Sequence, residues 1–394
     1  MRDKIYVLVL NYRSWQDTVI CLESLLRSDD PDYQVVVIDN SSGDGSAECI
    51  VRWLEGDLTP PFVESDPLGS LFTPPLKKKI PFIRYAAEEA ENGGDEKREK
   101  ALERQMRDRY AKGDERAVKG RIKRGEHSPG LNSVNVYNKS GPPETAPTSR
   151  HPVILIQSDS NRGYAGGNNI GIRYALKKGD FSALWVLNND TVVEADSLRL
   201  LRERAAQLRS SNRRVGIIGS KVLYYDSPDI IQSVGGRYNR WLAVPRHIGE
   251  GEPDRGQYDD TAHHIDYVPG VAMLLLGEFI DEVGIMNEEY FLFFEELDLA
   301  ARGARRGWGL DICTGSRVYH KEGRSTGSNV NPKRRSYLSE FYQLRNRSVF
   351  TGNYYRRYLP SVYFGYLLSL LNGMMRGQFY RFRIIYDIIR GARP

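Results

Sequence analysis

The sequence predicts an α/β fold with a mostly parallel central sheet. Four short runs are apolar along almost their whole length, as strands buried on both faces are. They cover Ile5–Leu10, Gln34–Ile38, Val153–Ile156 and Ala183–Leu187. Between the first two, Trp15–Leu26 has apolar residues at helical spacing. Strands that alternate with helices are typical of a parallel sheet covered by helices.

Each of the four runs ends on polar residues. These ends are Asn11-Tyr12, Asp39-Asn40-Ser41, Ser158-Asp159-Ser160 and Asn188-Asn189-Asp190. A single cluster of this kind is explained by a turn, because Asn and Asp tolerate turn geometry. In open α/β sheets, however, the ligand lies beyond the carboxyl ends of the strands. Four polar clusters at that edge therefore favour one shared site over four unrelated turns.

Residues 57–151 interrupt this alternation. The segment begins rich in Pro and Gly and continues with a dense mixture of acidic and basic residues. We interpret it as an insertion with one or two solvated helices and mobile stretches. A lid over an acceptor is the alternative interpretation, but mixed charge of this kind more often marks a solvated surface.

The chain beyond Asp190 continues with a helix at about Ser197–Leu208, a strand-like segment at residues 215–225 and the apolar run "VAMLLLG". Residues 331–394 hold twelve Lys and Arg against two acids, a net +10; because the whole chain is +5, residues 1–330 are −5. A basic end on an acidic body suggests an anionic surface as partner. This end also holds the apolar stretch "YLPSVYFGYLLSLLNGMM", which is at the short limit for crossing a bilayer.

That apolar stretch better suits an amphipathic segment at a membrane interface, with a helical pair packed on the body as the alternative. The basic region contains no recognised RNA or DNA motif, so we expect no nucleic-acid partner. The three cysteines match no metal spacing and fit a reducing compartment. The N-terminus is too short and too quickly polar for a signal peptide. We therefore expect a cytoplasmic protein, peripheral at the inner face of the cell membrane.

A glycine-rich turn follows the third strand. Gly163, Gly166 and Gly167 lead into a helix, where backbone approaches a ligand closely and a helix N-terminus favours anions. The pattern is neither G-x-G-x-x-G nor a P-loop, which argues against those two nucleotide sites. Together with Asn161 and Asn168, it indicates contact with a sugar nucleotide rather than a plain turn.

Three further carboxylates lie within one helical turn. Glu295, Glu296 and Asp298 follow the apolar run Phe291–Phe294. Acids in a first turn suit the helix dipole, which is a sufficient structural explanation. A carboxylate beside an apolar wall also has a raised pKa, as a general base requires.

Two candidates for metal binding stand at strand ends. Asp190 offers a carboxylate to Mg²⁺ or Mn²⁺, and Asn188 adds an amide oxygen that reaches metal, phosphate or sugar. His320 ends the strand-like "SRVYH", and imidazole also suits Mn²⁺.

The ordered set of these motifs resembles glycosyltransferase family 2, the inverting GT-A fold, and most closely its rhamnosyltransferase and galactofuranosyltransferase-type members. The matching stretches cover most of residues 1–56 and 152–330, and they are "VLVLNYRSWQDTVICLESLL", "VVVIDNSSGDGS", "NRGYAGGNNIGIRYAL", "LWVLNNDTVV", "YFLFFEELDLAARGARRGW" and "VYHKEGRST". "FYQLRNRSVF" resembles a Tyr-x-x-x-Arg-Asn segment that follows the catalytic domain in many such enzymes.

The resemblance implies a GT-A nucleotide-sugar-binding domain made of residues 1–56 and 152–330. Residues 57–151 are then an insertion, and residues 331–394 a basic amphipathic helical region. Among the site residues, Asp39 matches the acid that contacts the nucleotide base, and Asn11 its neighbour. Asn188-Asn189-Asp190 occupies the place of the metal-binding D-x-D motif, with Asn first, which leaves Asp190 as the main carboxylate.

His320 matches a histidine that completes the metal site. Glu295-Glu296 occupies the place of a Glu-Asp pair whose second member is the general base, so Glu296 is the expected base, and Glu295 and Asp298 are its substitutes. The implied cofactor is Mg²⁺ or Mn²⁺.

The implied function is an inverting transfer of a sugar from a nucleotide-diphosphate donor to a hydroxyl of a glycan or lipid-linked acceptor, in cell-surface polysaccharide or glycoconjugate synthesis. One alternative is a catalytically degenerate binding module for nucleotide sugars at a membrane, because the metal motif begins with Asn. Another is a sugar-phosphate nucleotidyltransferase. That class needs a Gly-rich loop with Arg and Lys after the first strand, which "LNYRSWQD" lacks.

Overall fold

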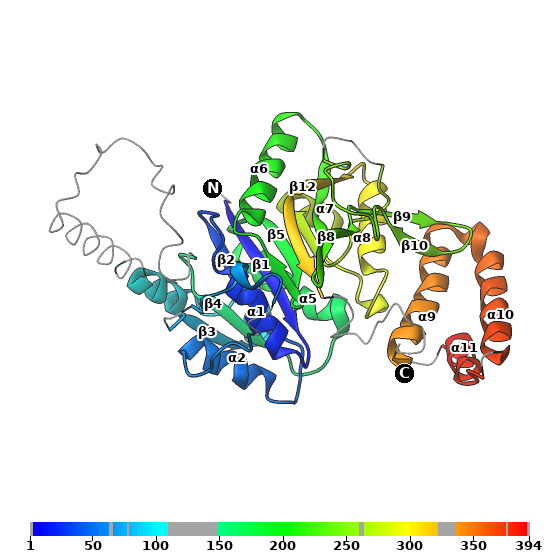
Figure 1. The fold of residues 1–394 in the computed structure, drawn as a ribbon, viewed down its shortest axis with the longest axis horizontal. Helices are drawn as coiled ribbons and strands as arrows, with labels where there is room; N and C mark the ends of the chain where they lie inside the picture. The colour runs from blue at the N-terminus through cyan, green and yellow to red at the C-terminus, as the bar shows by residue number, and fades with distance from the viewer. Residues whose placement is uncertain are drawn as a thin grey trace.

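The computed structural model describes residues 3–62, 66–76, 79–106, 108, 149–259, 264–321, 336–375 and 377–391 (Figure 1). Its strands are β1 Lys4–Asn11, β2 Tyr33–Asp39, β3 Phe82–Ala86, β4 Val153–Gln157, β5 Phe181–Asn188, β6 Thr191–Val193, β7 Val215–Tyr224, β8 Ser227–Ser233, β9 Gly236–Asn239, β10 Val244–His247, β11 Ala272–Leu276 and β12 Gly309–His320. Its α-helices are α1 Trp15–Leu25, α2 Ser46–Glu55, α3 Ala87–Glu91, α5 Gly163–Lys178, α6 Ser197–Ser210, α7 Gly277–Val283, α8 Glu295–Ala304, α9 Tyr337–Tyr354, α10 Leu359–Met375 and α11 Tyr380–Arg390. Short 3₁₀ turns are η1 Gly69–Leu71, η2 Glu288–Tyr290 and η4 Arg356–Tyr358.

The central sheet contains the four predicted strands as neighbours. Its main path runs β3-β4-β2-β1-β5-β11-β7-β12-β6, with β8 paired to β7. From β3 to β5 every pairing is parallel, whereas β11 is antiparallel to both of its neighbours. The predicted α/β class with a mostly parallel sheet is confirmed, as is the helical C-terminal region.

The register of the parallel strands brings their polar ends to one level. Asn11 of β1 pairs with Asp39 of β2, which in turn pairs with Gln157 of β4. On the other side of β1, Leu10 pairs with Asn188 of β5. The apolar parts of these strands are buried between covering helices, so the polar side chains gather at the carboxyl edge of the sheet.

The segment that we expected as an insertion contributes to the sheet itself. Its strand β3 pairs in parallel with β4 at the sheet edge. A helix over residues 96–106 is joined to the body by buried Glu99, which accepts hydrogen bonds from Tyr85 and Tyr174 and pairs with Lys178 at 2.6 Å. Residues 109–148, where we expected further solvated helices or a lid, lie outside the described part of the chain.

Helix α5 approaches the sheet closely because two of its residues lack a side chain. A Cβ at Gly167 would lie 2.6 Å from Leu10 Cδ1, and a Cβ at Gly171 would lie 3.0 Å from Leu8 Cδ2. Both distances are too short for ordinary carbon contacts. Gly167 and Gly171 therefore bring the helix against β1 and β2, and thereby fix its N-terminus beside the polar edge.

The C-terminal helices share a second hydrophobic core with helix α8. Phe294 and Leu297 pack there with Phe341 and Phe350 of α9 and with Tyr366 of α10. Figure 1 shows α9, α10 and α11 together at one end of the molecule. Within the described residues, none of the helices has the length and apolar character needed to cross a bilayer.

Candidate active site

The Asp39 carboxylate is held at the carboxyl edge by donors from two strands and from the loop after β2. Asn11 Nδ2 donates to Asp39 Oδ1 at 2.6 Å, Ser42 donates to both oxygens through its hydroxyl and its backbone N–H, and Gln157 Nε2 donates to Oδ2 at 2.8 Å. Asp39 is 1% exposed. The amides of Asn11 and Gln157 flank the carboxylate and make a rigid polar wall at this edge.

The start of α5 is fixed by two asparagines and by a carbonyl group. Asn40 Nδ2 donates to Asn161 Oδ1 and to Gly163 O, while the Gly163 N–H also donates to Asn161 Oδ1. Gly163 has φ +69°, a conformation that glycine adopts without strain. Tyr164 N–H donates to Phe291 O at 2.6 Å. The first helical N–H groups therefore bind the loop before α8.

The other small and amide residues of α5 differ in their surroundings. Gly166 lies over Arg162 and Glu288. Asn168 Nδ2 donates to Tyr164 O, whereas its Oδ1 is buried and has no hydrogen-bond partner among the described residues. Asn168 Oδ1 therefore remains able to accept a hydrogen bond from a ligand.

The three polar residues at the end of β5, Asn188, Asn189 and Asp190, have different surroundings. Asn189 Nδ2 donates to Thr18 Oγ1 at 2.9 Å, and Thr18 donates to Asn11 Oδ1 at 2.8 Å. Asn189 thus connects the end of β5 to the Asp39 wall through α1. Asn188 Oδ1, in contrast, is buried without a partner in the described part of the chain.

Asp190 and His320 face each other with atoms suited to bind one cation. His320 Nε2 lies 3.2 Å from Asp190 Oδ1, and both side chains are buried. His320 Nδ1 lies 2.9 Å from Gln232 Oε1, which orients the ring so that Nε2 faces Asp190. Asp190 Oδ1 has no hydrogen-bond partner among the described residues. Two ligand atoms bound at right angles to one Mg²⁺ or Mn²⁺ lie about 3 Å apart, so the pair fits a divalent cation.

Lys321, the residue after His320, lies next to this pair. Lys321 N–H donates to Asp190 O, and Lys321 Nζ donates to Asp17 Oδ1 at 2.8 Å. Burial alone would raise the pKa of Asp190, but His320 and Lys321 outweigh burial, and the net effect lowers that pKa. Asp190 is therefore an anion at neutral pH, ready to bind a metal.

Glu295, which is buried, and Glu296, which is half-buried, form a carboxyl pair at the start of α8. Burial first, and then repulsion from Glu296, raise the pKa of Glu295 well above its usual range. Burial also raises the pKa of Glu296, while a hydrogen bond from Glu295 opposes that rise. The pair therefore holds a proton to a higher pH than two exposed glutamates would. One Oε2 oxygen of each lacks a partner among the described residues.

Asp298 differs from this pair although it lies on the same helical turn. It accepts hydrogen bonds from Arg302 Nε at 2.7 Å and from Tyr354 of α9 at 2.6 Å. Tyr290 donates to the same carboxylate. A buried carboxylate with three donors is occupied by the protein, so the geometry of Asp298 favours a structural role.

The metal pair and the carboxyl pair share a neighbour, the side chain of Tyr164. Burial and then the charges of Glu295, Glu296 and Asp190 raise the pKa of the Tyr164 phenol. Its hydroxyl donates to Gly270 O at 2.6 Å. Tyr164 N–H donates to Phe291 O in the loop before α8, and its hydroxyl acceptor, Gly270, directly precedes Val271, whose carbonyl accepts from Asn188 N–H at the end of β5. These hydrogen bonds bring the start of α8 close to the end of β5.

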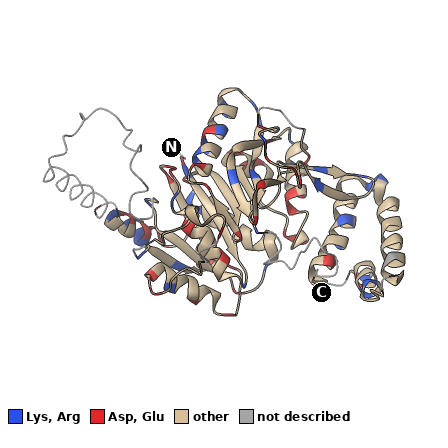
Figure 2. Cartoon of the chain, viewed as in Figure 1, with Lys and Arg blue, Asp and Glu red and all other residues tan. Residues whose placement is uncertain are grey.

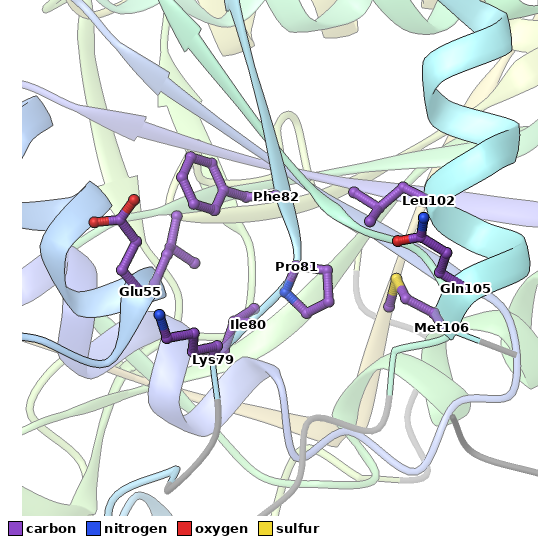
Figure 3. Close-up of a pocket in the computed structure, with 9 residues that line it drawn as sticks. Glu55, Lys79, Ile80, Pro81, Phe82, Leu102, Gln105 and Met106 are labelled. Atoms are coloured by element: carbon purple, nitrogen blue, oxygen red, sulfur yellow. The ribbon is translucent and has the colours of Figure 1, made fainter. Parts of the chain in front are cut away.

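A pocket of about 290 Å³ lies elsewhere on the molecule (Figure 3). It is lined by Leu54, Glu55, Lys79, Ile80, Pro81, Phe82, Leu102, Gln105 and Met106. Phe82 is the first residue of β3, so the pocket lies at the amino end of a strand. The polar side chains described above gather at the opposite, carboxyl edge of the parallel strands.

Comparison with known proteins bears on this site. No protein-family model matches the chain. Over 234 residues the chain is 23% identical to a low-salt glycan biosynthesis hexosyltransferase of Haloferax volcanii, a match that covers 58% of this chain and 69% of that protein. The predicted resemblance to family 2 glycosyltransferases is confirmed. The match supports a glycosyltransferase as the enzyme class.

This chain is also similar to solved structures, among them the following two. GalNAc-T7 with UDP, GalNAc and Mn²⁺ matches with a TM-score of 0.46 and 14% identity, over 90% of this chain and 48% of that chain, about half its length. The mannosyltransferase PcManGT from Pyrobaculum calidifontis, in complex with GDP-Man and Mn²⁺, matches with a TM-score of 0.46 and 11% identity, over 99% of this chain and 88% of that chain.

Several residues of this candidate site were not predicted from the sequence. Gln157 ends a buried strand just as Asp39 does, and this position was the available signal. Lys321 directly follows His320, and this position next to a predicted residue was also an available signal. Gln232 and Tyr164 had no local signal, because their roles depend on contacts between segments distant in the chain.

Proposed function

We propose that this chain is an inverting glycosyltransferase that moves a sugar from a nucleotide-diphosphate donor to an acceptor hydroxyl. The observation on which the proposal rests is the shared locality of two unsatisfied sites. The Asp190–His320 pair fits a divalent cation, and the Glu295–Glu296 pair fits proton transfer. Hydrogen bonds of Tyr164 and Asn188 connect the loop before α8 to the end of β5, so the two pairs lie close together. An inverting transfer needs these two devices on either side of one sugar.

In the proposed reaction, Glu296 accepts the proton of the acceptor hydroxyl. As that proton leaves, the hydroxyl oxygen forms a bond to the anomeric carbon, and the bond from this carbon to the diphosphate oxygen breaks. Glu295 keeps its own proton and donates a hydrogen bond to Glu296, which holds the base in place. A single displacement of this kind inverts the configuration at the anomeric carbon.

The leaving diphosphate would lie at the Asp190–His320 pair. When bound there, Mg²⁺ or Mn²⁺ supplies Lewis-acid stabilisation of the charge on the diphosphate. The ammonium of Lys321 is paired with Asp17, and the charge of Lys321 favours the ionised form of Asp190. We place the nucleotide and sugar beside the Asp39 wall, Asn161 and the unpartnered oxygens of Asn168 and Asn188. The predicted glycines Gly163, Gly166 and Gly167 instead pack against Phe291, Arg162 and Leu10.

A degenerate binding module is the second candidate. Asn188 occupies the first position of the metal motif, and the described residues contain no group of three His, Cys, Asp or Glu placed to hold a metal. Such a module would bind a nucleotide sugar without turning it over.

One screen tests both candidates. Thermal shift with UDP-, dTDP- and GDP-sugars, each with and without Mn²⁺, should give a metal-dependent rise in Tm for one donor class. Release of the nucleoside diphosphate from that donor in the presence of glycan or lipid-linked acceptors then separates an enzyme from a binding module. A chain that binds none of these donors would refute both candidates.

We further propose that α10 and α11 bind an anionic lipid surface, which would place the site at the inner face of the membrane near lipid-linked acceptors. Apolar side chains exposed on α10 recur at helical spacing: Phe364, Leu367, Leu368, Leu371, Met374 and Met375. Helix α10 contains no charged residue, and Arg356, Arg357, Arg383 and Arg390 lie on the adjoining η4 and α11. Figure 2 shows this uncharged helix beside basic neighbours. Such a surface suits the boundary between headgroups and acyl chains.

This surface gives a direct prediction. The double variant Phe364→Glu, Leu368→Glu should lower the fraction that floats with vesicles of phosphatidylcholine and phosphatidylglycerol by at least about tenfold, because two apolar contacts with lipid are replaced by charge. Leu176→Glu, which changes an exposed leucine on α5, is the matched control and should float like the unaltered chain. Equal flotation of all three proteins, or none by the unaltered chain, would refute membrane binding.

A further inference from the structure

The loop before the carboxyl pair has an unusual backbone. Phe291, Phe293 and Phe294 have φ values of 61°, 68° and 73°. Bulky side chains rarely adopt this left-handed region, so the surrounding structure must hold these residues there. Phe294 directly precedes Glu295, and its backbone therefore sets the direction in which α8 and its first two carboxyls leave the loop.

One buried side chain of α9 binds most of this loop. Asn346 is 0% exposed, and its Nδ2 lies 2.9 Å from each of three carbonyl oxygens, those of Tyr290, Leu292 and Phe293. Arg345 Nη1 donates to Asn346 Oδ1 at 2.8 Å. This contact fixes the orientation of the amide, so its N–H groups face the loop.

The remaining contacts of the loop complete its support. Phe291 O accepts from Tyr164 N–H of α5, and the Phe291 ring stacks on Tyr342 of α9 with centroids 4.8 Å apart. The rings are therefore held by packing, whereas the backbone is held by α5 on one side and by Asn346 on the other. This arrangement connects α5, the loop of residues 290–294 before Glu295, and helix α9.

We propose that Asn346 is a positioning residue that holds residues 290–294 in their strained conformation and thereby aims Glu295 and Glu296 at the acceptor hydroxyl. The proposal rests on the proposed glycosyl transfer for its catalytic consequence. Asn346 touches neither carboxyl in this arrangement, and it acts through the backbone of the loop.

Two substitutions test this role. Asn346→Asp keeps the size of the side chain but replaces the donating amide by an acceptor that faces three carbonyls. Asn346→Ala removes the group altogether. Tyr366→Phe is the matched control. It removes a buried hydrogen bond from α10 to Leu344 O of α9, the helix that contains Asn346, without touching the loop.

We expect hydrogen–deuterium exchange of peptides covering residues 290–297 to be at least about tenfold faster in both Asn346 variants and unchanged in Tyr366→Phe. With the matched donor, kcat should fall by about 10²-fold while the donor KM stays within about twofold, because the base is misplaced and the donor site is not. Loss of packing alone would instead leave Asn346→Asp close to the unaltered protein.

Two results would overturn the proposal: unaltered exchange of the loop in Asn346→Asp, or an unaltered kcat in the same variant. If the unaltered chain transfers no sugar from any donor, the proposed function fails. In that case the exchange measurement still determines whether Asn346 holds the loop.

Discussion

Glu296→Gln should lower kcat by about 10²–10⁴-fold, the range that a positioned general base commonly contributes. Gln keeps the size and the hydrogen bonding of the side chain but cannot accept the acceptor proton. Glu295→Gln should retain most activity, because an amide N–H replaces the carboxyl proton that Glu295 donates to Glu296. Initial rates of nucleoside diphosphate release at saturating donor measure both effects.

The same base predicts the pH dependence. Burial raises the pKa of Glu296 above the ordinary value for glutamate, and only the ionised form accepts a proton. The rate should therefore be lost as pH falls through this raised pKa, at a higher pH than an exposed Glu would give. Glu203→Gln, which makes the same chemical change at an exposed pair with Arg199, is the control and should leave the profile in place.

The relative activities of Glu295→Gln and Glu296→Gln determine which of the two glutamates is the base. A large loss in Glu295→Gln with little in Glu296→Gln would reverse their roles. Full activity in both variants would remove the carboxyl pair from the mechanism.

Asp190→Ala should abolish metal-dependent nucleotide binding and reduce transfer by more than about 10²-fold, since metal neutralisation is worth several kcal/mol. Asp190 Oδ1 and His320 Nε2 are the two buried atoms that face each other, and the substitution leaves the histidine alone. The Mn²⁺-dependent part of the donor-induced rise in Tm measures the loss without reference to turnover. We expect the fold to persist, because Lys321 keeps its partner Asp17.

Asp229→Ala provides the comparison for this substitution, because Asp229 is an exposed aspartate on β8. It should keep the Mn²⁺-dependent shift in full. If Asp190→Ala kept that shift as well, the cation would have to bind elsewhere, and the Asp190–His320 pair would no longer be its site.

The sequence alone was sufficient for four of the five strands of the parallel half of the sheet, β1, β2, β4 and β5. Their residues are apolar without interruption because helices cover both faces, and this pattern is local. Strand β3 was not predicted, because "FIRYA" alternates in burial as an edge strand does and lies between Pro-rich and charged segments. Its place at the sheet edge depends on pairing with β4, more than sixty residues later in the chain.

The glycine-rich turn shows the same limit. The sequence predicts that backbone comes close to something at Gly163–Gly171, and in the structure Gly167 and Gly171 meet Leu10 and Leu8 of the sheet. A missing side chain permits close approach by a ligand or by a neighbouring element, and the local sequence is the same in both cases.

What the sequence determined by itself was the set of chemical groups: carboxylates, amides and an imidazole at the ends of apolar segments, and three acids in one helical turn. Only the tertiary structure distinguished their roles. Asp298 is bound by Arg302 and by Tyr354 of a distant helix, while Glu295 and Glu296 keep an oxygen without a partner among the described residues. The physical reason is that local sequence fixes which groups are present, whereas burial and hydrogen-bond partners come from segments far along the chain, and these contacts set which groups remain reactive.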